Sequence, residues 1–315
     1  MSKKSNKNLS KARKDKNDEF YTQLTDIEKE LARYKNHFRG KTVLCNCDDP
    51  KESNFVKYFS LNFEHLGLKK LIATHYKDST LSPQPPHALV FNGNVFTQQL
   101  LGDGDFRSEE CLNLLAEADI VVTNPPFSLF REYIDQLITH DKKFLVIGNM
   151  NAISYKEIFK LIKDNKVWLG YEFNKSLQFN IPDSYEKFSH LDAAGRKVAV
   201  VPAICWFTNL THSKRNEKLE GFATYLGNEK AYPKYDNYDA IEVSKVVNLP
   251  IDYTGVMGVP ITFLGKYNPQ QFEIVNANDF RMSTKVPKKE HGLIKDKEAA
   301  INGKITYVRI VIKRK

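Results

Sequence analysis

A short apolar run, followed at once by a proline-rich turn and a helical pattern, restricts the folds that this chain can adopt. Residues 118–122 (Ala-Asp-Ile-Val-Val) are apolar and β-branched, which is typical of a central strand. After Ser128, apolar residues recur at helical spacing, at Leu129, Phe130, Tyr133, Ile134, Leu137 and Ile138. Residues 124–127 therefore lie where a parallel strand ends and its crossover helix begins. In open α/β sheets, ligands bind at that carboxyl edge.

Similar patterns alternate along the first two thirds of the chain. Strands are expected at residues 42–47, 70–75, 118–122, 144–148, 167–171 and 198–207, and helices at 22–38, 55–63, 111–116, 129–138 and 156–163. This alternation predicts an α/β fold, in which a largely parallel sheet carries helices on both faces. Beyond residue 209 the chain becomes rich in Gly, Pro and Tyr, although residues 305–313 alternate like a final strand.

These changes in pattern divide the chain into three parts. Residues 1–17 hold seven Lys and Arg residues and one acid, Asp15, so we expect a flexible basic arm. Its composition fits a solubilising tail and a DNA-contacting arm equally well. We expect a first domain at residues 18–210 and a second region, with a terminal strand, at residues 211–315.

Bulk properties narrow the class of protein. A chain of 315 residues with 41% hydrophobic residues suits one large domain or two modest ones, and a net charge of +9 points to a polyanionic partner or an anionic membrane surface. No apolar run approaches the roughly 18 residues of a spanning helix, and the N-terminus lacks a hydrophobic signal region, so a cytoplasmic protein is expected. The four cysteines fit no disulfide framework or zinc spacing.

The turn after residue 123 has unusual chemistry. Pro125 and Pro126 fix φ and remove two backbone donors, so the carbonyls before them point outward. The side-chain oxygen of Asn124 and the carbonyl of Pro125 would make a pair of acceptors suited to a planar amino group. Phe127 would add an aromatic face. The alternative is a rigid turn capped by Ser128 with Phe127 in the core, and the tetrapeptide alone does not decide between them.

Asn-Pro-Pro-Phe at the end of a strand resembles the catalytic motif of S-adenosylmethionine-dependent amino methyltransferases, chiefly those that act on adenine N6 in DNA. Further segments resemble the EcoRI-type adenine-specific DNA methyltransferases, namely residues 18–23, 45–50, 53–55, 102–107, 233–239 and 255–260. The resemblance is weakest at residues 77–95. It implies a Rossmann-like methyltransferase domain at 18–210 with Asn124, Pro125, Pro126 and Phe127 as catalytic residues, and a target-recognition region at 211–315.

S-adenosylmethionine is the cofactor that the resemblance implies, but the loop after the first strand is unusual for such a site. A Gly-rich turn normally lets the backbone approach a dinucleotide-type ligand, whereas residues 47–50 read Cys-Asp-Asp-Pro. By resemblance this loop is a divergent methionine-binding turn, and Asp48 and Asp49 are candidate partners of the α-ammonium or the sulfonium. The alternative is an Asp-Pro turn that caps the following helix.

The other cofactor contacts also come from the resemblance. Asp105 would accept a hydrogen bond from the amino group of the cofactor's adenine, and Phe106 would lie against that ring. Tyr21 and Thr22 would line the methionine end of the pocket. The acidic residue that normally binds the ribose hydroxyls after the second strand is absent from residues 73–76, which read Ala-Thr-His-Tyr.

Duplex DNA is the partner that the resemblance implies, and the target adenine would flip out of the duplex and stack on Phe127. Sequence recognition is expected in the C-terminal third, where Lys234, Tyr235 and Asn237 are candidate DNA contacts. An ordinary surface turn explains that Tyr-rich stretch equally well. The resemblance also favours a monomer that belongs to a restriction-modification system and works beside a restriction endonuclease without forming a stable complex with it.

Two other functions stay open on the sequence. Closely related motifs occur in methyltransferases that act on RNA or on a protein amide side chain. A non-catalytic nucleic-acid-binding protein of the same fold would explain the missing glycines and the missing ribose carboxylate. The length of the C-terminal region favours a site-specific adenine-N6 methyltransferase of duplex DNA.

Overall fold

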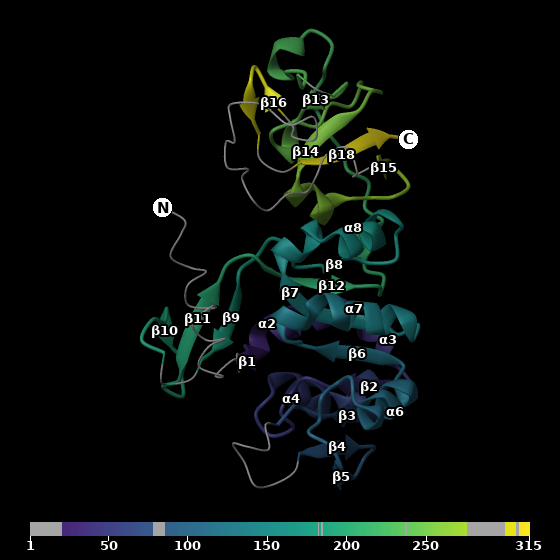
Figure 1. Ribbon diagram of the computed structural model, residues 1–315, viewed down its shortest axis with the longest axis vertical. Coiled ribbons are helices and arrows are strands. Elements are labelled where there is room, and N and C mark those ends of the chain that lie inside the picture. Colours follow the sequence, from purple (N-terminus) through teal and green to yellow (C-terminus); the bar gives the residue numbers. More distant parts are fainter. Residues whose placement is uncertain are drawn as a thin grey trace. The chain divides into compact units, whose positions relative to one another are not determined.

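The computed structural model describes residues 21–77, 86–181, 183, 185–236, 238–275, 300–306 and 309–315 (Figure 1). The predicted basic arm at residues 1–17 lies outside them. The chain divides into two compact units, one made of residues up to 150 and residues 175–210, and the other of residues 151–174 and 211–315.

Residues 151–174 are expected from the sequence to lie in the first domain, but the structure assigns them to the second unit. The reason is side-chain contact across the sequence. A ring nitrogen of His212 lies 3.0 Å from the carbonyl oxygen of Leu169, and the guanidinium of Arg215 lies 4.5 Å from the centroid of the Trp168 ring. The division also changes at residue 210, where the composition of the chain shifts.

The first unit is built on a mixed sheet whose strands in this unit lie in the order β5-β4-β3-β2-β6-β7-β12 (Figure 1). Its centre is parallel, as predicted, and consists of β3 (Lys70–Ala73), β2 (Thr42–Cys45), β6 (Ile120–Thr123) and β7 (Lys143–Asn149). β12 (Ile204–Thr208) runs antiparallel to β7. At the opposite edge, β4 (His87–Phe91) and β5 (Val95–Gln99) form an antiparallel hairpin.

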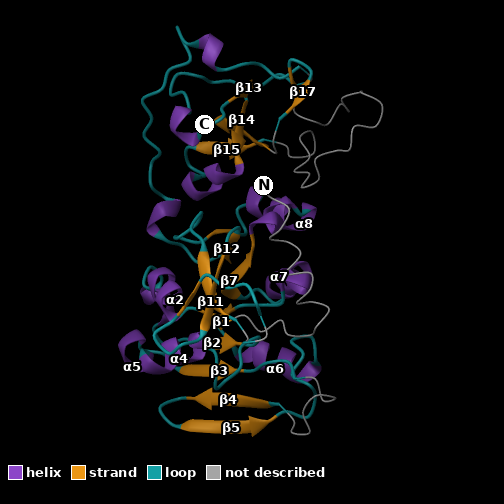
Figure 2. Ribbon diagram, turned by 90° about the vertical axis from the view of Figure 1, so that its left-hand side faces the viewer, coloured by secondary structure: helices purple, strands orange, loops and turns teal. Residues whose placement is uncertain are grey.

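Helices cover both faces of this sheet, as Figure 2 shows. One face carries α2 (Leu24–Leu31), α4 (Asn54–Leu61) and α5 (Phe63–Leu66), and the other carries α6 (Glu109–Glu117) and α7 (Phe130–Thr139). Helix α3 (Lys35–Phe38) contacts α5. Two helices begin at serine caps: Ser53 accepts a hydrogen bond from the N–H of Phe55, and Ser108 accepts one from the N–H of Cys111. The predicted Rossmann-like α/β architecture is therefore confirmed.

Two local predictions are wrong. The strand expected at residues 198–207 is two strands, β11 (Lys197–Val201) and β12, because Ala203 between them adopts a left-handed φ of 62° that interrupts extended structure. The two strands pair in different sheets. The helix expected at residues 22–38 begins with a short strand, β1 (Tyr21–Thr22), and is then divided into α2 and α3.

A small antiparallel sheet places the N-terminal strand beside the main one. Its order is β1-β9-β11-β10, with β9 (Leu177–Asn180) pairing with β1 and β10 (His190–Leu191) at the far edge. The amide of Gln23 donates a hydrogen bond of 2.7 Å to the side-chain oxygen of Asn180. These pairings hold Thr22 in a defined place.

The second unit has its own small sheet, in the order β13-β14-β18-β15. Its strands are β13 (Ile241–Glu242), β14 (Met257–Pro260), β18 (Arg309–Arg314) and β15 (Phe272–Ile274), and it also holds α8 (Lys156–Lys163), β8 (Trp168–Leu169), β16 (Ala300–Ile301) and β17 (Lys304–Ile305). The predicted final strand thus lies mainly in β18. Among the described residues of the whole chain, no helix combines the length and the apolar character needed to cross a bilayer.

Candidate active site at the carboxyl edge of the sheet

Three loops of the first unit meet at one edge of the sheet. β2 has β3 on one side and β6 on the other, and both neighbours run parallel to it. The chain passes from β2 to β3 and later returns to the other side of β2 as β6. The loops after β2 and β6 therefore diverge at a topological switch point, where α/β sheets bind ligands.

The proline-rich turn follows β6 at this switch point. Asn124 and Phe127 are half-buried, Pro125 is buried and Pro126 is exposed. Phe127 packs against the main hydrophobic cluster and begins a short 3-10 helix, η1 (Phe127–Leu129). Helix α7 then begins at Phe130 without a side-chain cap, so the alternative of a turn capped by Ser128 is not what forms. Phe127 keeps part of its ring accessible.

A buried carboxylate from the loop after β2 holds this turn. Asp48 is 6% exposed, and its side chain accepts hydrogen bonds from the Ser53 hydroxyl at 2.8 Å and from the Thr123 hydroxyl. The backbone N–H of Asn124 donates to it as well. Burial nevertheless raises the pKa of Asp48 to about 6. Among the described residues, no cationic side chain forms an ion pair with this carboxylate.

The carboxylate of Asp49 contacts both its own loop and His75, which follows the neighbouring strand β3. One oxygen accepts hydrogen bonds from the N–H groups of Lys51 at 2.7 Å and Glu52 at 3.2 Å, as expected of an Asp turn. The other lies 3.3 Å from Nε2 of His75, which follows β3. Asp49 and His75 therefore join the ends of two adjacent strands at the place where the sequence lacks the usual ribose-binding acid.

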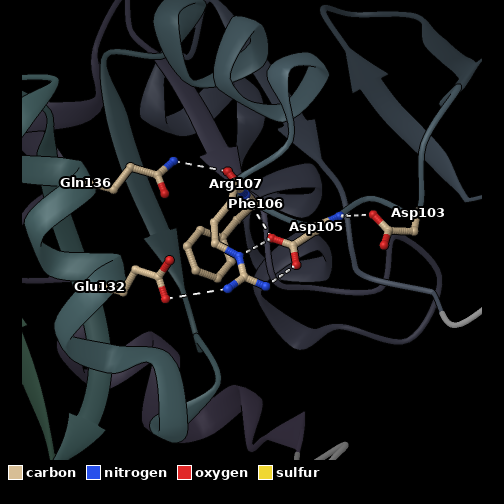
Figure 3. Close-up of polar contacts among 6 residues, drawn as sticks. All are labelled: Asp103, Asp105, Phe106, Arg107, Glu132 and Gln136. Atoms are coloured by element: carbon tan, nitrogen blue, oxygen red, sulfur yellow. Dashed lines mark hydrogen bonds and ion pairs between the residues drawn. The ribbon is translucent and has the colours of Figure 1, made fainter.

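The predicted adenine-binding loop carries an ion pair (Figure 3). The guanidinium of Arg107 donates to Asp105 from Nη2 at 2.6 Å and from Nε at 2.9 Å, and Arg107 holds the pKa of Asp105 below its usual range. The same guanidinium lies 5.4 Å from the centroid of the Phe106 ring and 3.5 Å from a carboxylate oxygen of Glu132 on α7. Figure 3 also shows Gln136 of α7, whose amide donates to the carbonyl of Phe106 at 3.0 Å.

A glycine brings this loop onto the end of β3. Gly104 has a φ of 78°, and a Cβ there would lie 2.2 Å from the carbonyl oxygen of His75. Close by, the N–H of Lys77 donates to the carbonyl of Asp103 at 2.8 Å. Phe106 is almost fully buried and meets the ring of Tyr133 edge-on at 5.0 Å. The loop is therefore fixed both to the sheet edge and to α7.

Several buried polar atoms at this edge have no hydrogen-bond partner among the described residues, and they include Oγ1 of Thr22, Nδ2 of Asn46 and Oγ1 of Thr74. These three atoms belong to β1 and to the residues just after β2 and β3. A buried polar group without a partner is unfavourable by about 1–3 kcal/mol. A polar ligand at this edge would satisfy them, so the residues present fit a cofactor with many donors and acceptors.

The candidate DNA contacts lie in the second unit and differ in exposure. Tyr235 is 5% exposed; its hydroxyl donates to the carboxylate of Glu242, which Arg309 also binds at 2.6 Å. A Cβ at Gly258 would lie 2.1 Å from that hydroxyl, so the hydroxyl end of the ring packs closely against Gly258 of β14. Tyr235 therefore leaves little of its surface exposed for contact with DNA. Lys234 is exposed, and Asn237 lies outside the described residues.

Sequence reasoning missed several residues that build the site. Thr123 and Tyr133 fit the strand and helix patterns, and a polar residue at the last position of a buried strand is the one signal that would have marked Thr123. The hydroxyl of Tyr133 donates to the side-chain oxygen of Asn46. Arg107 lies next to the predicted Phe106, but its contact with Glu132 on α7 joins distant parts of the sequence. His75 contacts Asp49, which follows another strand.

Comparisons of the sequence with known proteins identify the family to which the chain is similar. The sequence model of the adenine-specific methyltransferase EcoRI matches residues 8–315. The type II methyltransferase M.EcoRI of Escherichia coli is 48% identical, over 98% of this chain and 97% of the relative. M.MgeORF184P of Mycoplasma genitalium is 42% identical over 97% of this chain and 98% of the relative. M.MpnI of Mycoplasma pneumoniae is 42% identical over 98% of both chains.

Proposed function

Because the chain belongs to the EcoRI family of adenine-specific methyltransferases, we propose that it binds S-adenosylmethionine at the carboxyl edge of β2, β3 and β6 and methylates N6 of an adenine flipped out of duplex DNA. One observation carries the proposal. The Asn-Pro-Pro-Phe turn lies at the switch point with Asn124 and Phe127 half-buried, in the same unit as buried polar atoms of Thr22, Asn46 and Thr74 that have no partner among the described residues.

The cofactor would lie along the ends of the three strands. Thr22, Asn46 and Thr74 offer hydroxyl and amide groups to its polar parts, and Asp105 offers a carboxylate to its adenine amino group. When bound, S-adenosylmethionine supplies a methyl group activated by a positively charged sulfur. The loop of Gly104 and Asp105 encloses the adenine end, because it is held to β3 on one side and to α7 on the other.

The target amino group would be held by the turn. Its two hydrogens donate to the side-chain oxygen of Asn124 and to the carbonyl of Pro125, which shifts the nitrogen toward tetrahedral geometry and exposes its lone pair. The accessible part of Phe127 supports the extruded base by stacking. Fixed acceptors of this kind act by orientation and electrostatics and need no strong general base, since the methylated nitrogen is acidic while it is cationic.

The partners follow from the same proposal. A net charge of +9 suits a DNA substrate, and the exposed Lys234 is available for a phosphate. We also propose that the protein works as a monomer, since one strand is modified per event, and that it protects DNA beside a restriction endonuclease.

Methyl transfer from labelled S-adenosylmethionine to a panel of DNA duplexes, RNAs and protein substrates tests the function. We expect label in adenine N6 of duplex DNA, and label in RNA or protein alone would overturn the proposal. Asn124→Ala should reduce transfer on the order of 10²–10³-fold while cofactor affinity stays within about 2-fold. The matched control is Asn92→Ala, an exposed asparagine in the turn between β4 and β5, which should retain full activity.

A further inference from the structure

Asp48 is expected from the sequence to bind the cofactor, but its contacts lead elsewhere. One oxygen of its carboxylate accepts the hydrogen bond from Ser53 and the other accepts the one from Thr123. With 6% of the residue exposed, the carboxylate lies within the protein. Its three donors are Ser53, which is the N-cap of α4, Thr123 at the end of β6, and the N–H of Asn124 directly after that strand. Asp48 therefore ties together the two loops that diverge at the switch point.

Thr123 is fixed from two sides. It is the last residue of β6 and is fully buried. Its hydroxyl donates to Asp48 and accepts a hydrogen bond of 3.2 Å from the N–H of Cys47. A side chain held in this way has one rotamer that satisfies both contacts. The backbone that leads into Asn124 is fixed with it.

The turn itself has few means of holding its own shape. Pro125 and Pro126 carry no N–H group and cannot donate to a neighbouring carbonyl. The N–H of Asn124, which directly precedes them, donates to Asp48. The carboxylate is therefore the anchor for the entry of the turn, and the 3-10 bond from Leu129 to the carbonyl of Pro126, at 3.0 Å, holds its exit.

We propose that Asp48 is a positioning residue of the catalytic turn. Through the Thr123 hydroxyl and the Asn124 N–H it sets where the two acceptor oxygens lie, so it acts on the rate of methyl transfer rather than on cofactor affinity. The inference rests on the proposed role of Asn124. A displacement of about 1 Å in a positioned group can reduce the rate on the order of 10²-fold.

Two substitutions at Thr123 and one matched control test the inference. Thr123→Val removes the hydroxyl at similar volume and should lower kcat by about 10–100-fold, with the KM for S-adenosylmethionine within about 3-fold. Thr123→Ser restores the hydroxyl and should recover kcat to within about 3-fold. The matched control is Thr208→Val, which removes another fully buried threonine hydroxyl at the end of a strand, where it donates to the carbonyl of Phe144 at 2.6 Å. This variant should leave kcat within about 3-fold.

Asp48→Asn provides a second test, which does not depend on how Thr123→Val folds. We expect this variant to bind S-adenosylmethionine, measured by calorimetry, with nearly wild-type affinity and to transfer methyl groups at least 10-fold more slowly. A loss of cofactor affinity with kcat retained, or wild-type kcat in Thr123→Val, would overturn the inference. Absence of adenine methylation by the wild-type protein would instead overturn the proposed function.

Discussion

The buried carboxylate of Asp48 makes stability depend on pH in an unusual direction. Burial raises its pKa to about 6, whereas an unfolded aspartate titrates near 3.9. Between about pH 4 and pH 6 the folded chain therefore binds more protons than the unfolded chain, so the free energy of unfolding falls as the pH rises through this window and levels off above it. A difference of about two pH units corresponds to about 3 kcal/mol.

Asp48→Asn removes the charge and should remove this dependence. The amide retains one acceptor oxygen but loses at least one of the hydrogen bonds to the carboxylate, which is unfavourable by about 1–2 kcal/mol. Above pH 7 the variant should therefore be more stable than the wild type by about 1–2 kcal/mol. For a unit of this size that raises Tm by roughly 2–8 °C. A variant that is more stable and less active is what a functional positioning residue predicts.

Chemical denaturation at pH 5 and pH 8 measures the effect. We expect the wild type to lose stability between these values through Asp48, and Asp48→Asn to lose less. Asp119 is the control of opposite sign: burial disfavours its charge, but the Thr42 N–H at 2.8 Å and Lys41 at 3.3 Å outweigh burial and lower its pKa. Asp119→Asn should lower stability at pH 8. A less stable Asp48→Asn at pH 8, with the slope of the wild type, would refute the reasoning.

Other substitutions probe the rest of the site. Gly104→Ala places a Cβ 2.2 Å from a backbone carbonyl oxygen and should weaken cofactor binding about 10-fold or more by calorimetry, whereas Gly102→Ala, in open space, should not. Arg107→Ala should raise the Kd for S-adenosylmethionine several-fold because Asp105 loses its orientation, yet change thermal stability by less than about 1 kcal/mol, since the pair is partly exposed. Phe127→Ala should reduce methyl transfer more than Phe127→Trp in single-turnover assays; equal losses would argue against stacking.

The central strands were predictable because each carries its own signal. β2, β3, β6 and β7 are short apolar runs between helical patterns, so periodicity locates them to within a few residues. The hairpin of β4 and β5 was not predicted, because β5 is exposed along its whole length and lacks an alternating apolar pattern. The turn at Ala203 was missed because a left-handed φ at alanine leaves no mark in the sequence.

The candidate site also has a part that the sequence predicts and a part that depends on strand pairing. The turn of Asn124 and Phe127 follows from local chemistry, since the prolines and the preceding strand are contiguous with it. The partners of Asp48 do not, because Thr123 lies 75 residues away and reaches Asp48 through the pairing of β2 with β6. The same limit applies to Tyr235. Its aromatic side chain suggested a DNA contact, but the sequence does not indicate that the ring is buried against Gly258 in the folded unit.

Local signals in the chain were thus sufficient for the α/β class and for the position of the candidate turn, and the resemblance of several segments indicated the methyltransferase family. Only the folded structure shows that Asp48 accepts a hydrogen bond from Thr123, that Arg107 contacts Glu132 on α7, and that His75 and Asp49 meet where a ribose-binding acid is missing. The physical reason is that periodicity and turn chemistry act between near neighbours in the sequence. Hydrogen bonds and ion pairs between strand ends depend on which strands lie side by side, and that arrangement exists only in the folded sheet.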